Sequence, residues 1–333
     1  MNPSKIPILS IGIPTFNRHL RLKELLQSIV DQQNIVTEEV EVFVSDNSPG
    51  EEAKSIVSSF NGKIQNLRYH KNSKNIGADA NILQLFKMSR GEYVWIMPDD
   101  DLFATPQSVK NVVDKIQSTK VQLTYLNLNS RIIQFDSNEI IQQSVYSFHG
   151  DIIFMNGKDI LNVLTDIDLL AANRLVIKRN AIKLEFSEPY CQGSLLSPLA
   201  LSLAACSSGP ALVTSDVMTL YREGSVLEWR KNWFKLLLQD MTGIMLDAVR
   251  KLKYSQDVVN NIVERRKVLG FKIITPHYLI FQLNGLSWRV LSQYYGKFYV
   301  FKQVMVKIFY ALPKKGFKKI IPSKIKILSK RLS

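Results

Sequence analysis

The first hundred residues alternate between short apolar runs and segments in which apolar residues repeat at helical spacing. The runs have the length and composition of buried strands, and they are Ile6–Pro14, Val40–Ser45, Leu67–His70 and Tyr93–Met97. The intervening spacing predicts helices over Leu20–Val30, Glu51–Phe60 and Ala78–Met88. This alternation predicts an α/β fold, in which a mostly parallel sheet carries helices on both faces.

The pattern changes beyond residue 100. It predicts further helices over Ser108–Ser118, Ile152–Leu164 and Leu195–Ala205, and strands over Val121–Leu128 and Arg131–Phe135. After Trp229 the spacing is mostly helical, most clearly in Trp233–Arg250 and Val258–Leu269. We therefore expect an α/β domain over residues 1–226, followed by a mainly helical region over residues 227–333.

Composition narrows the class of protein. The 333 residues are 46% hydrophobic, and the two cysteines, Cys191 and Cys206, are too few for a disulfide framework or a zinc cluster. The uncharged stretch Pro189–Ser215 is interrupted by prolines, a glycine and serines, so a buried helix with a loop is favoured over a membrane span. No secretory signal is apparent, and we expect a reducing, cytoplasmic setting.

Positive charge is concentrated at the C-terminus. The chain carries a net charge of +14, yet the last acidic residue is Glu264, and sixteen Lys and Arg follow it. Such a block favours a polyanionic partner, either a lipid surface or a nucleic acid. Beyond Leu312 the basic residues interleave with aliphatic ones and no nucleic-acid reader motif appears, which predicts a tail at an anionic membrane surface and no nucleic-acid partner. A solvated basic tail is the alternative.

Polar side chains follow three of the predicted strands, in Thr15–Arg18, Asp46–Ser48 and Asp99–Asp101. Ligands of parallel sheets bind outside the carboxyl ends of the strands. Three adjacent carboxylates repel one another unless a cation offsets their charge, and Mg²⁺ or Mn²⁺ held by one or two carboxylates and by diphosphate oxygens suits this arrangement. The alternative is a solvated loop that caps a helix at Asp101.

Two further loops are candidates for the same site. Asp46 ends a strand, where its carboxylate could accept hydrogen bonds from a nucleobase or ribose, although Asp46–Gly50 also has the composition of a plain turn. The loop Asn72–Gly77 precedes a helix, and Gly77 permits close backbone approach to a phosphate at the helix N-terminus.

Together these segments resemble family 2 glycosyltransferases of the GT-A fold. The resemblance rests on SIGIPTFNR at Ser10–Arg18, VFVSDNS at Val42–Ser48, N-x-G at Asn75–Gly77 and GEYVWIMPDDD at Gly91–Asp101. It covers about the first 105 residues, in the order and spacing of the family. A dinucleotide-binding oxidoreductase would instead have G-x-G-x-x-G after the first strand, and a nucleotidyltransferase a glycine-rich phosphate loop there.

The resemblance implies a role for each matched residue. It implies a nucleotide-sugar donor bound near Pro14, Thr15, Asn17 and Arg18, with Asp46 at the base. Asp99 and Asp101 would be the catalytic DxD pair and the ligands of Mg²⁺ or Mn²⁺, with Asp100 beside them. Further donor contacts are assigned to Asn75, Gly77 and Asp79. Arg222 is assigned to the diphosphate, with a structural ion pair as the alternative.

The chain departs from the family at the position of the catalytic base. The usual Glu-Asp pair is absent from the stretch Ser187–Ser194, so Glu188 is our candidate catalytic residue there, with Glu185 as the alternative. The absence favours retention of configuration over inversion. The Gln-x-x-Arg-Trp signature of processive members is also missing, which favours transfer of a single sugar.

The overall character is similar to that of abequosyltransferases of bacterial O-antigen and lipopolysaccharide assembly. This resemblance implies transfer of abequose from CDP-abequose to a lipid-linked (undecaprenyl-diphosphate) oligosaccharide. It also implies a peripheral position on the cytoplasmic face of the bacterial inner membrane. A nucleotidyltransferase acting on a sugar phosphate and a basic nucleic-acid-binding protein remain the alternatives.

Overall fold

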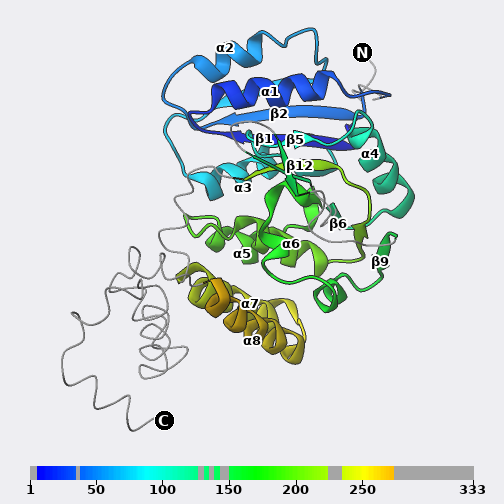
Figure 1. Ribbon diagram of the computed structural model, residues 1–333, viewed down its shortest axis with the longest axis vertical. Helices are drawn as coiled ribbons and strands as arrows, with labels where there is room; N and C mark the ends of the chain where they lie inside the picture. The colour runs from blue at the N-terminus through cyan, green and yellow to red at the C-terminus, as the bar shows by residue number, and fades with distance from the viewer. Residues whose placement is uncertain are drawn as a thin grey trace, which may run out of the picture. The chain divides into compact units, whose positions relative to one another are not determined.

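The computed structural model describes residues 6–34, 38–126, 131–134, 139–142, 150–223 and 235–273 (Figure 1). The chain divides into two compact units, one of residues 1–227 with 243–262, and the other of residues 228–242 with 263–333. The expected domains, residues 1–226 and 227–333, stay a prediction. All the site residues discussed below lie in the first unit. The basic tail lies outside the described residues.

Among the described residues of the first unit, an eight-stranded sheet has the order β3-β2-β1-β4-β10-β6-β11-β9. Its strands are β1 (Leu9–Thr15), β2 (Val40–Asp46), β3 (Leu67–Lys71), β4 (Tyr93–Ile96), β6 (Leu123–Leu126), β9 (Ile152–Phe154), β10 (Leu175–Lys178) and β11 (Ala211–Thr214). The strands β1 to β4 are mutually parallel, and β10 runs antiparallel to both β4 and β6. The predicted α/β fold is confirmed. The sheet is mixed, and the four strands predicted in the first hundred residues, β1 to β4, are the ones that run parallel to one another.

Helices cover both faces of this sheet (Figure 1). The α-helices of the described residues are α1 (His19–Val30), α2 (Glu52–Ser58), α3 (Ala78–Met88), α4 (Ser108–Thr119), α5 (Leu184–Ser187), α6 (Ser197–Cys206), α7 (Met241–Leu252) and α8 (Gln256–Ile273). Leu9, Ile11 and Ile13 of β1 share one core cluster with residues of α1, α2 and α4. The opposite face of β1 meets α3, where a Cβ atom on Gly12 would lie 3.1 Å from Leu85 Cδ1. Successive residues of β1 point to opposite faces of the sheet, and helices pack on each face, so β1 is buried on both faces.

A second, four-stranded sheet of described residues has the order β5-β12-β7-β8. It consists of β5 (Leu102–Phe103), β12 (Thr219–Glu223), β7 (Arg131–Gln134) and β8 (Ile140–Gln142). β12 pairs antiparallel with β5, with Thr219 opposite Phe103 and Leu220 opposite Leu102. Because β5 begins directly after Asp101, this pairing fixes the end of the acidic segment to a strand more than a hundred residues later in the chain.

One predicted helix is wrong. Residues Ile152–Phe154 form the edge strand β9, which pairs with β11, and a 3-10 helix, Gly157–Asn162, follows it. A Cβ atom on Gly157 would lie 2.3 Å from the carbonyl oxygen of Gly209, so this glycine lets the chain turn closely against its neighbour. Tertiary pairing thus overrides the helical spacing of the apolar residues.

The interpretation of Pro189–Ser215 as a buried helix with a loop is confirmed. All ten residues of α6 within this stretch are buried. The helix is buried around its whole circumference because it packs between elements of the first unit, in contact with α3, α5 and β10. Within the described residues, no helix combines the length and the apolar character that a membrane span requires.

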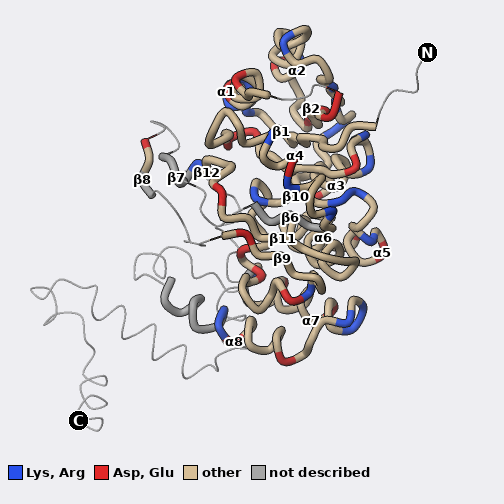
Figure 2. The backbone as a smooth tube through the Cα atoms, turned by 90° about the vertical axis from the view of Figure 1, so that its right-hand side faces the viewer, with Lys and Arg blue, Asp and Glu red and all other residues tan. Residues whose placement is uncertain are grey.

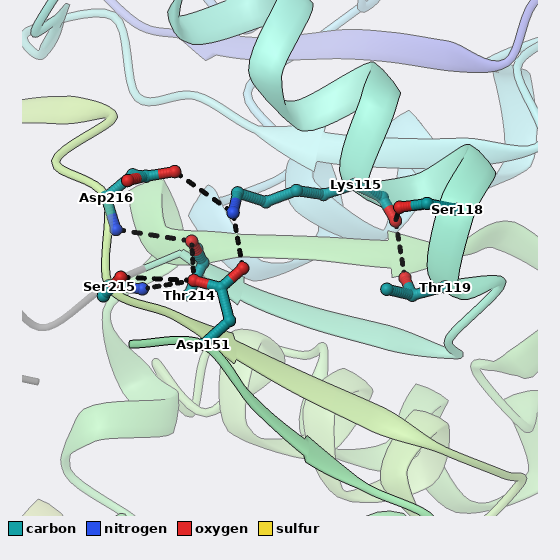
Figure 3. Close-up of polar contacts among 7 residues, drawn as sticks. All are labelled: Lys115, Ser118, Thr119, Asp151, Thr214, Ser215 and Asp216. Atoms are coloured by element: carbon teal, nitrogen blue, oxygen red, sulfur yellow. Dashed lines mark hydrogen bonds and ion pairs between the residues drawn. The ribbon is translucent and has the colours of Figure 1, made fainter. Parts of the chain in front are cut away.

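A charged cluster ties α4 to the far strands of the sheet (Figure 3). The ammonium group of Lys115 forms ion pairs with Asp151, just before β9, and with Asp216 Oδ2 at 3.1 Å, just after β11. The other oxygen of Asp151 accepts hydrogen bonds from Thr214 Oγ1 at 3.0 Å and from the Ser215 amide at 2.9 Å. The cluster therefore holds the start of the segment that leads from β11 to β12.

Candidate active site

The acidic segment Asp99–Asp101 lies just past the carboxyl end of β4, and the carboxyl end of β1 lies next to it. Thr15 Oγ1 donates a hydrogen bond to Asp99 Oδ2 at 2.6 Å. Arg18, in the turn after β1, reaches the same segment through NH1, which lies 3.2 Å from Asp99 Oδ1 and 2.7 Å from Asp100 Oδ2. The structure thus brings together two groups of residues that the sequence placed 81 to 84 positions apart.

These carboxylates are buried together. Asp99 and Asp101 are 3% and 2% exposed. Burial, with the neighbouring charge of Asp100, raises the pKa of Asp99 to about 7 and raises the pKa of Asp101 well above its usual range. The cation of Arg18 opposes the first shift, and the amide and cation of Arg222, with the cation of Arg174, oppose the second. Ionising these buried carboxyl groups together is therefore unfavourable unless a further cation offsets their charge.

This donor set fits a hard divalent cation. Carboxylate oxygens are the ligands that Mg²⁺ and Mn²⁺ prefer, and Mg²⁺ commonly takes only one or two of them and completes its shell with phosphate oxygens and water. Among the described residues, no group of three or more His, Cys, Asp and Glu side chains forms a cage for a metal ion. The segment therefore suits an ion that arrives with a phosphate ligand, and it does not suit a closed structural metal site.

Arg222 of β12 supports the acidic segment from behind. Its amide donates to Asp101 Oδ1 at 3.0 Å, and its NH1 donates to the carbonyl oxygen of Asp100 at 2.9 Å. Its NH2 forms an ion pair with Glu24 of α1. The Arg222 side chain is fully buried, so its placement is that of a support for the acidic segment, and its predicted contact with a diphosphate stays a prediction.

The carboxyl end of β2 forms a second polar cluster. Asp46 is fully buried, and its two oxygens accept hydrogen bonds from the Ser48 amide and from the Tyr69 hydroxyl, both at 2.7 Å. The amide of Asn17 donates to Ser48 Oγ at 2.9 Å, which joins this cluster to the turn after β1. Pro14 is half-buried next to this turn and faces Ser45 in the sheet register. The predicted base-binding residue thus lies at the same sheet edge as Asp99.

The loop before α3 closes the same edge. Asn75 Oδ1 accepts a hydrogen bond from the Gly77 amide at 2.9 Å, and the Gly77 carbonyl accepts one from Asn47 Nδ2 at 3.2 Å. Gly77 has φ +85°, a backbone conformation that glycine adopts without strain, and no atom would lie within 4 Å of an added Cβ. The predicted loop is therefore open on the side of Gly77.

Asp79 has a different placement from the other predicted donor contacts. Its carboxylate is buried and accepts hydrogen bonds from the Leu195 amide at 2.6 Å and the Ser197 amide at 3.1 Å. These amides lie at the N-terminus of α6, so Asp79 caps that helix. This contact fixes the loop that leads into α6 against the start of α3.

Glu188 lies apart from the acidic segment. It follows α5 and forms an ion pair with Lys87, whose Nζ lies 2.6 Å from Glu188 Oε1. Lys87 is in the last turn of α3, whereas Asp79 and Gly77 are at its first turn. An 11-residue helix is about 16 Å long, so Glu188 lies near the end of α3 that is remote from the loop of Gly77. Its assignment as a base stays a prediction with no contact that joins it to Asp99–Asp101.

Sequence reasoning missed two supporting residues, Glu24 and Tyr69. Glu24 has the spacing of an ordinary surface pair with Arg21, three positions earlier on α1, and this pair is also formed. Tyr69 is one of five half-buried residues of β3. Neither residue carries a local signal of a site, because the partner of each lies far away in the sequence. Ser48 belongs to the polar segment Asp46–Ser48 that the sequence singles out, but the hydrogen bond that it accepts from the amide of Asn17 could not be predicted.

The strand order and the helices on both faces of the sheet match the GT-A fold. The solved structure of Staphylococcus aureus TarS 1–349 in complex with UDP-GlcNAc is similar to this chain, with a TM-score of 0.62 and 16% identity over 86% of this chain and 80% of that one. The mannosyltransferase PcManGT from Pyrobaculum calidifontis, in complex with GDP-Man and Mn²⁺, is similar with a TM-score of 0.50 and 14% identity over 93% and 92%. Residues 10–169 match the family model described as Glycosyl transferase family 2, and this part of the chain belongs to that family.

Curated relatives match over part of the chain. The abequosyltransferase RfbV of Salmonella typhimurium is 29% identical over 133 residues, which are 40% of this chain and 36% of the relative. A GalNAc(5)-diNAcBac-PP-undecaprenol beta-1,3-glucosyltransferase of Campylobacter jejuni is 31% identical over 97 residues, which are 29% of this chain and 30% of the relative. The chain thus spans about a third of the length of these relatives. The family predicted from the sequence motifs is confirmed.

Proposed function

We propose that this protein is a glycosyltransferase that binds a nucleotide-sugar donor at the edge formed by β1, β2 and β4 and moves a single sugar to an acceptor. The observation that carries this proposal is the convergence of Thr15 and Arg18 on the buried carboxylate of Asp99. The family membership of residues 10–169 supports it, and so do two glycosyltransferase relatives.

The residues of the site divide into two tasks. Asp46, held by Tyr69 and Ser48, supplies acceptor oxygens for the base. Asp99 and Asp101 hold Mg²⁺ or Mn²⁺, which, when bound, neutralises negative charge that develops on the leaving nucleoside diphosphate. Asp100 and Arg18 complete the acidic segment, and Asn75 and Gly77 line the adjoining open loop.

Arg18 limits where the diphosphate can lie. Its guanidinium contacts both Asp99 and Asp100, and its side chain is 38% exposed, so it keeps access to solvent on the site side. The guanidinium fork matches the geometry of both carboxylate and phosphate groups. Arg18 therefore offers cationic donors to the donor phosphates while its carboxylate partners hold the metal ion.

The donor and acceptor are proposed by chemistry and by likeness to named relatives. We favour abequose from CDP-abequose as donor and an undecaprenyl-diphosphate-linked oligosaccharide of O-antigen or lipopolysaccharide synthesis as acceptor. One relative is an abequosyltransferase and another is named for a PP-undecaprenol substrate. A peripheral position at the cytoplasmic face of the bacterial inner membrane, held through the basic tail, follows from such an acceptor.

The chain offers Glu188 as the acceptor base, and its ion pair with Lys87 makes that role testable. If a Glu188→Gln variant keeps full transfer activity, Glu188 is not the acceptor base. Retention of configuration, in which the donor and product share anomeric form, requires no such base, and product analysis by NMR distinguishes the two cases.

The decisive experiment supplies purified full-length protein with CDP-, UDP- and GDP-sugars, with Mn²⁺ or Mg²⁺, and with a lipid-diphosphate trisaccharide acceptor. The expected result is metal-dependent release of CDP with transfer of one sugar. A parallel reaction supplies a nucleoside triphosphate and a sugar phosphate, and release of pyrophosphate there would instead establish a nucleotidyltransferase. A preference for UDP- or GDP-hexoses would keep the class and overturn the CDP-abequose assignment.

A further inference from the structure

An open cavity of about 480 Å³ lies between the end of α3 and the segment that runs through Arg179–Ala181 into α5. The backbone amide of Arg179 donates to the Glu92 carbonyl at 2.8 Å, and its Nε donates to the Gly91 carbonyl at 3.0 Å. Both carbonyls precede β4, whereas Asp99–Asp101 follow the other end of that strand. The cavity is therefore distinct from the candidate active site.

The cavity combines an apolar floor with a cationic rim. Phe86 and Ile182 are 2% and 6% exposed and form the floor, and Leu184 is 43% exposed at the edge. Lys87, Arg179 and Lys183 supply the cations of the rim. Figure 2 shows Lys and Arg segments in blue beside α3 and α5; Lys87 belongs to α3, and Arg179 and Lys183 precede α5. A ligand that fits must carry negative charge at one end and apolar surface at the other.

Two of the three cations lack an acidic partner. Lys87 is paired with Glu188 at 2.6 Å, but in the part of the chain that the structure describes no carboxylate lies within ion-pair distance of Arg179 or Lys183. The Lys183 ammonium donates instead to Ser207 Oγ at 2.8 Å. Burial and the positive charge of Lys158 lower the pKa of Lys183, so Lys158 is a fourth cation close to the rim. An anion at the rim would relieve this repulsion.

Lys183 also adopts an uncommon backbone conformation. Its φ is +42°, in the left-handed region that residues with a Cβ atom rarely occupy. Its carbonyl accepts hydrogen bonds from the Phe186 amide at 2.9 Å and the Ser187 amide at 3.0 Å, which hold it there. Non-glycine residues in this region are concentrated at functional sites. The conformation fixes the position of this lysine at the mouth of the cavity.

We propose that this cavity binds the phosphate group of an anionic phospholipid, with Arg179 and Lys183 at the phosphate and the glycerol–acyl junction against Leu184 and the apolar floor. An inorganic phosphate would leave the floor and Leu184 without a partner. A nucleic acid would need a stripe of phosphate contacts, whereas the cations at the mouth of this one cavity suit a single headgroup. The folded domain then carries a lipid contact of its own, separate from the donor site at Asp99–Asp101 and from the tail.

The test uses the full-length protein and calorimetric titration with dihexanoyl phosphatidic acid below its micelle concentration. The double variant Arg179→Gln/Lys183→Gln should bind it about 30-fold more weakly, which is about fivefold for each cation near an anionic lipid. The control is Lys63→Gln/Lys120→Gln, because both lysines are exposed and Lys120 is also left-handed at φ +52°. The control should keep wild-type affinity. The basic tail is the same in every variant.

Three further arms decide the chemistry. Dihexanoyl phosphatidylcholine, which has no net charge, should bind at least tenfold more weakly, and Leu184→Ser should weaken phosphatidic acid but not inorganic phosphate. Equal losses in the two double variants, or no loss in the first, would overturn the site. Inorganic phosphate that binds as tightly as the lipid would overturn the lipid assignment. Asp99→Asn should leave this binding unchanged, so failure of the proposed glycosyl transfer is recognised separately.

Discussion

Arg222 and Glu24 lie 198 positions apart in the chain and form an ion pair next to the acidic segment. The Arg222 side chain is fully buried, and the same residue holds Asp101 through its amide and Asp100 through its NH1 group. The pair therefore connects α1 of the predicted nucleotide half with the strand that supports the carboxylates. A buried arginine without its carboxylate is costly, so Glu24 sets the position of the acidic segment indirectly.

We expect Glu24→Gln to lower the free energy of unfolding by about 1–3 kcal/mol, the cost of leaving a buried charged group poorly paired. It should also raise the Mn²⁺ concentration needed for half-maximal transfer, because the acidic segment loses its fixed support. Chemical denaturation and metal titration measure the two effects. Lys23→Gln, an exposed neighbour on α1, should change neither. An unchanged metal dependence in Glu24→Gln would show that the pair is only structural.

Asp99→Asn is expected to change stability and activity in opposite directions. Removing one charge from a buried cluster of like charges should leave the stability of the metal-free protein equal or higher. Donor turnover should fall at least about 100-fold, as it does when a major electrostatic contribution to a transition state is lost. Thermal unfolding with and without Mn²⁺ gives the readout, and the stabilisation by Mn²⁺ should disappear in the variant. A variant that is still stabilised by Mn²⁺ would place the metal elsewhere.

Tyr69→Phe removes the hydrogen bond to Asp46 without altering the size of the ring. We expect the KM for the nucleotide sugar to rise about tenfold with kcat unchanged, because a lost hydrogen bond to a charged group costs about 1.5–3 kcal/mol and affects only donor binding. Steady-state kinetics test this. Tyr93→Phe is the matched control, because its hydroxyl donates to the Val121 carbonyl at 2.8 Å and does not touch Asp46.

Asp247 makes the attachment of α7 depend on pH. Burial opposes the shift, but the hydrogen bond from Tyr190 at 2.7 Å and the cations of Lys251 and Arg250 lower the pKa of Asp247 to about 2. A depressed pKa in the folded state gives stability that is present above the unfolded pKa and is lost as pH falls through the folded value. The interaction should therefore weaken between about pH 4 and pH 2.

Equilibrium denaturation of the wild type and Asp247→Asn across pH 2 to 7 checks this. The wild type should be more stable at pH 7, and the two proteins should converge near pH 2. A constant difference over the whole range would show that the hydrogen bond from Tyr190, and not the charge of Asp247, stabilises the attachment. Glu139→Gln, at an exposed position, serves as a control that should show no such convergence.

How much of the structure can be predicted from the sequence depends on how far apart in the chain the contacting residues lie. The strands and helices up to Ile96 follow from local patterning, since each apolar run and each helical spacing is visible in a few residues. The cluster of Thr15 and Asp99 could be anticipated because both follow strands of one parallel sheet. The β9 strand, which pairs with β11, could not, since helical spacing of apolar residues says nothing about a partner 60 residues away.

The same limit explains why some contacts of the site residues could not be foreseen. The donor contact of Asp79 stays a prediction, and its carboxylate accepts hydrogen bonds from amides at the start of α6, 116 and 118 positions later in the chain. Glu24 and Arg222 are ordinary helix and strand residues until the chain folds. Such pairs carry no spacing signal, and only the topology that brings β12 next to β5 reveals them.

The pairing of β5 with β12 has a consequence for the order of folding. Everything in the first 105 residues that resembles the family has been synthesised before the ribosome reaches Arg222, but Asp101 cannot receive its amide contact until that strand has docked. Long-range strand pairing of this kind forms slowly. A nascent or truncated chain that stops before β12 would carry every motif of the family and would still hold its acidic segment unsupported.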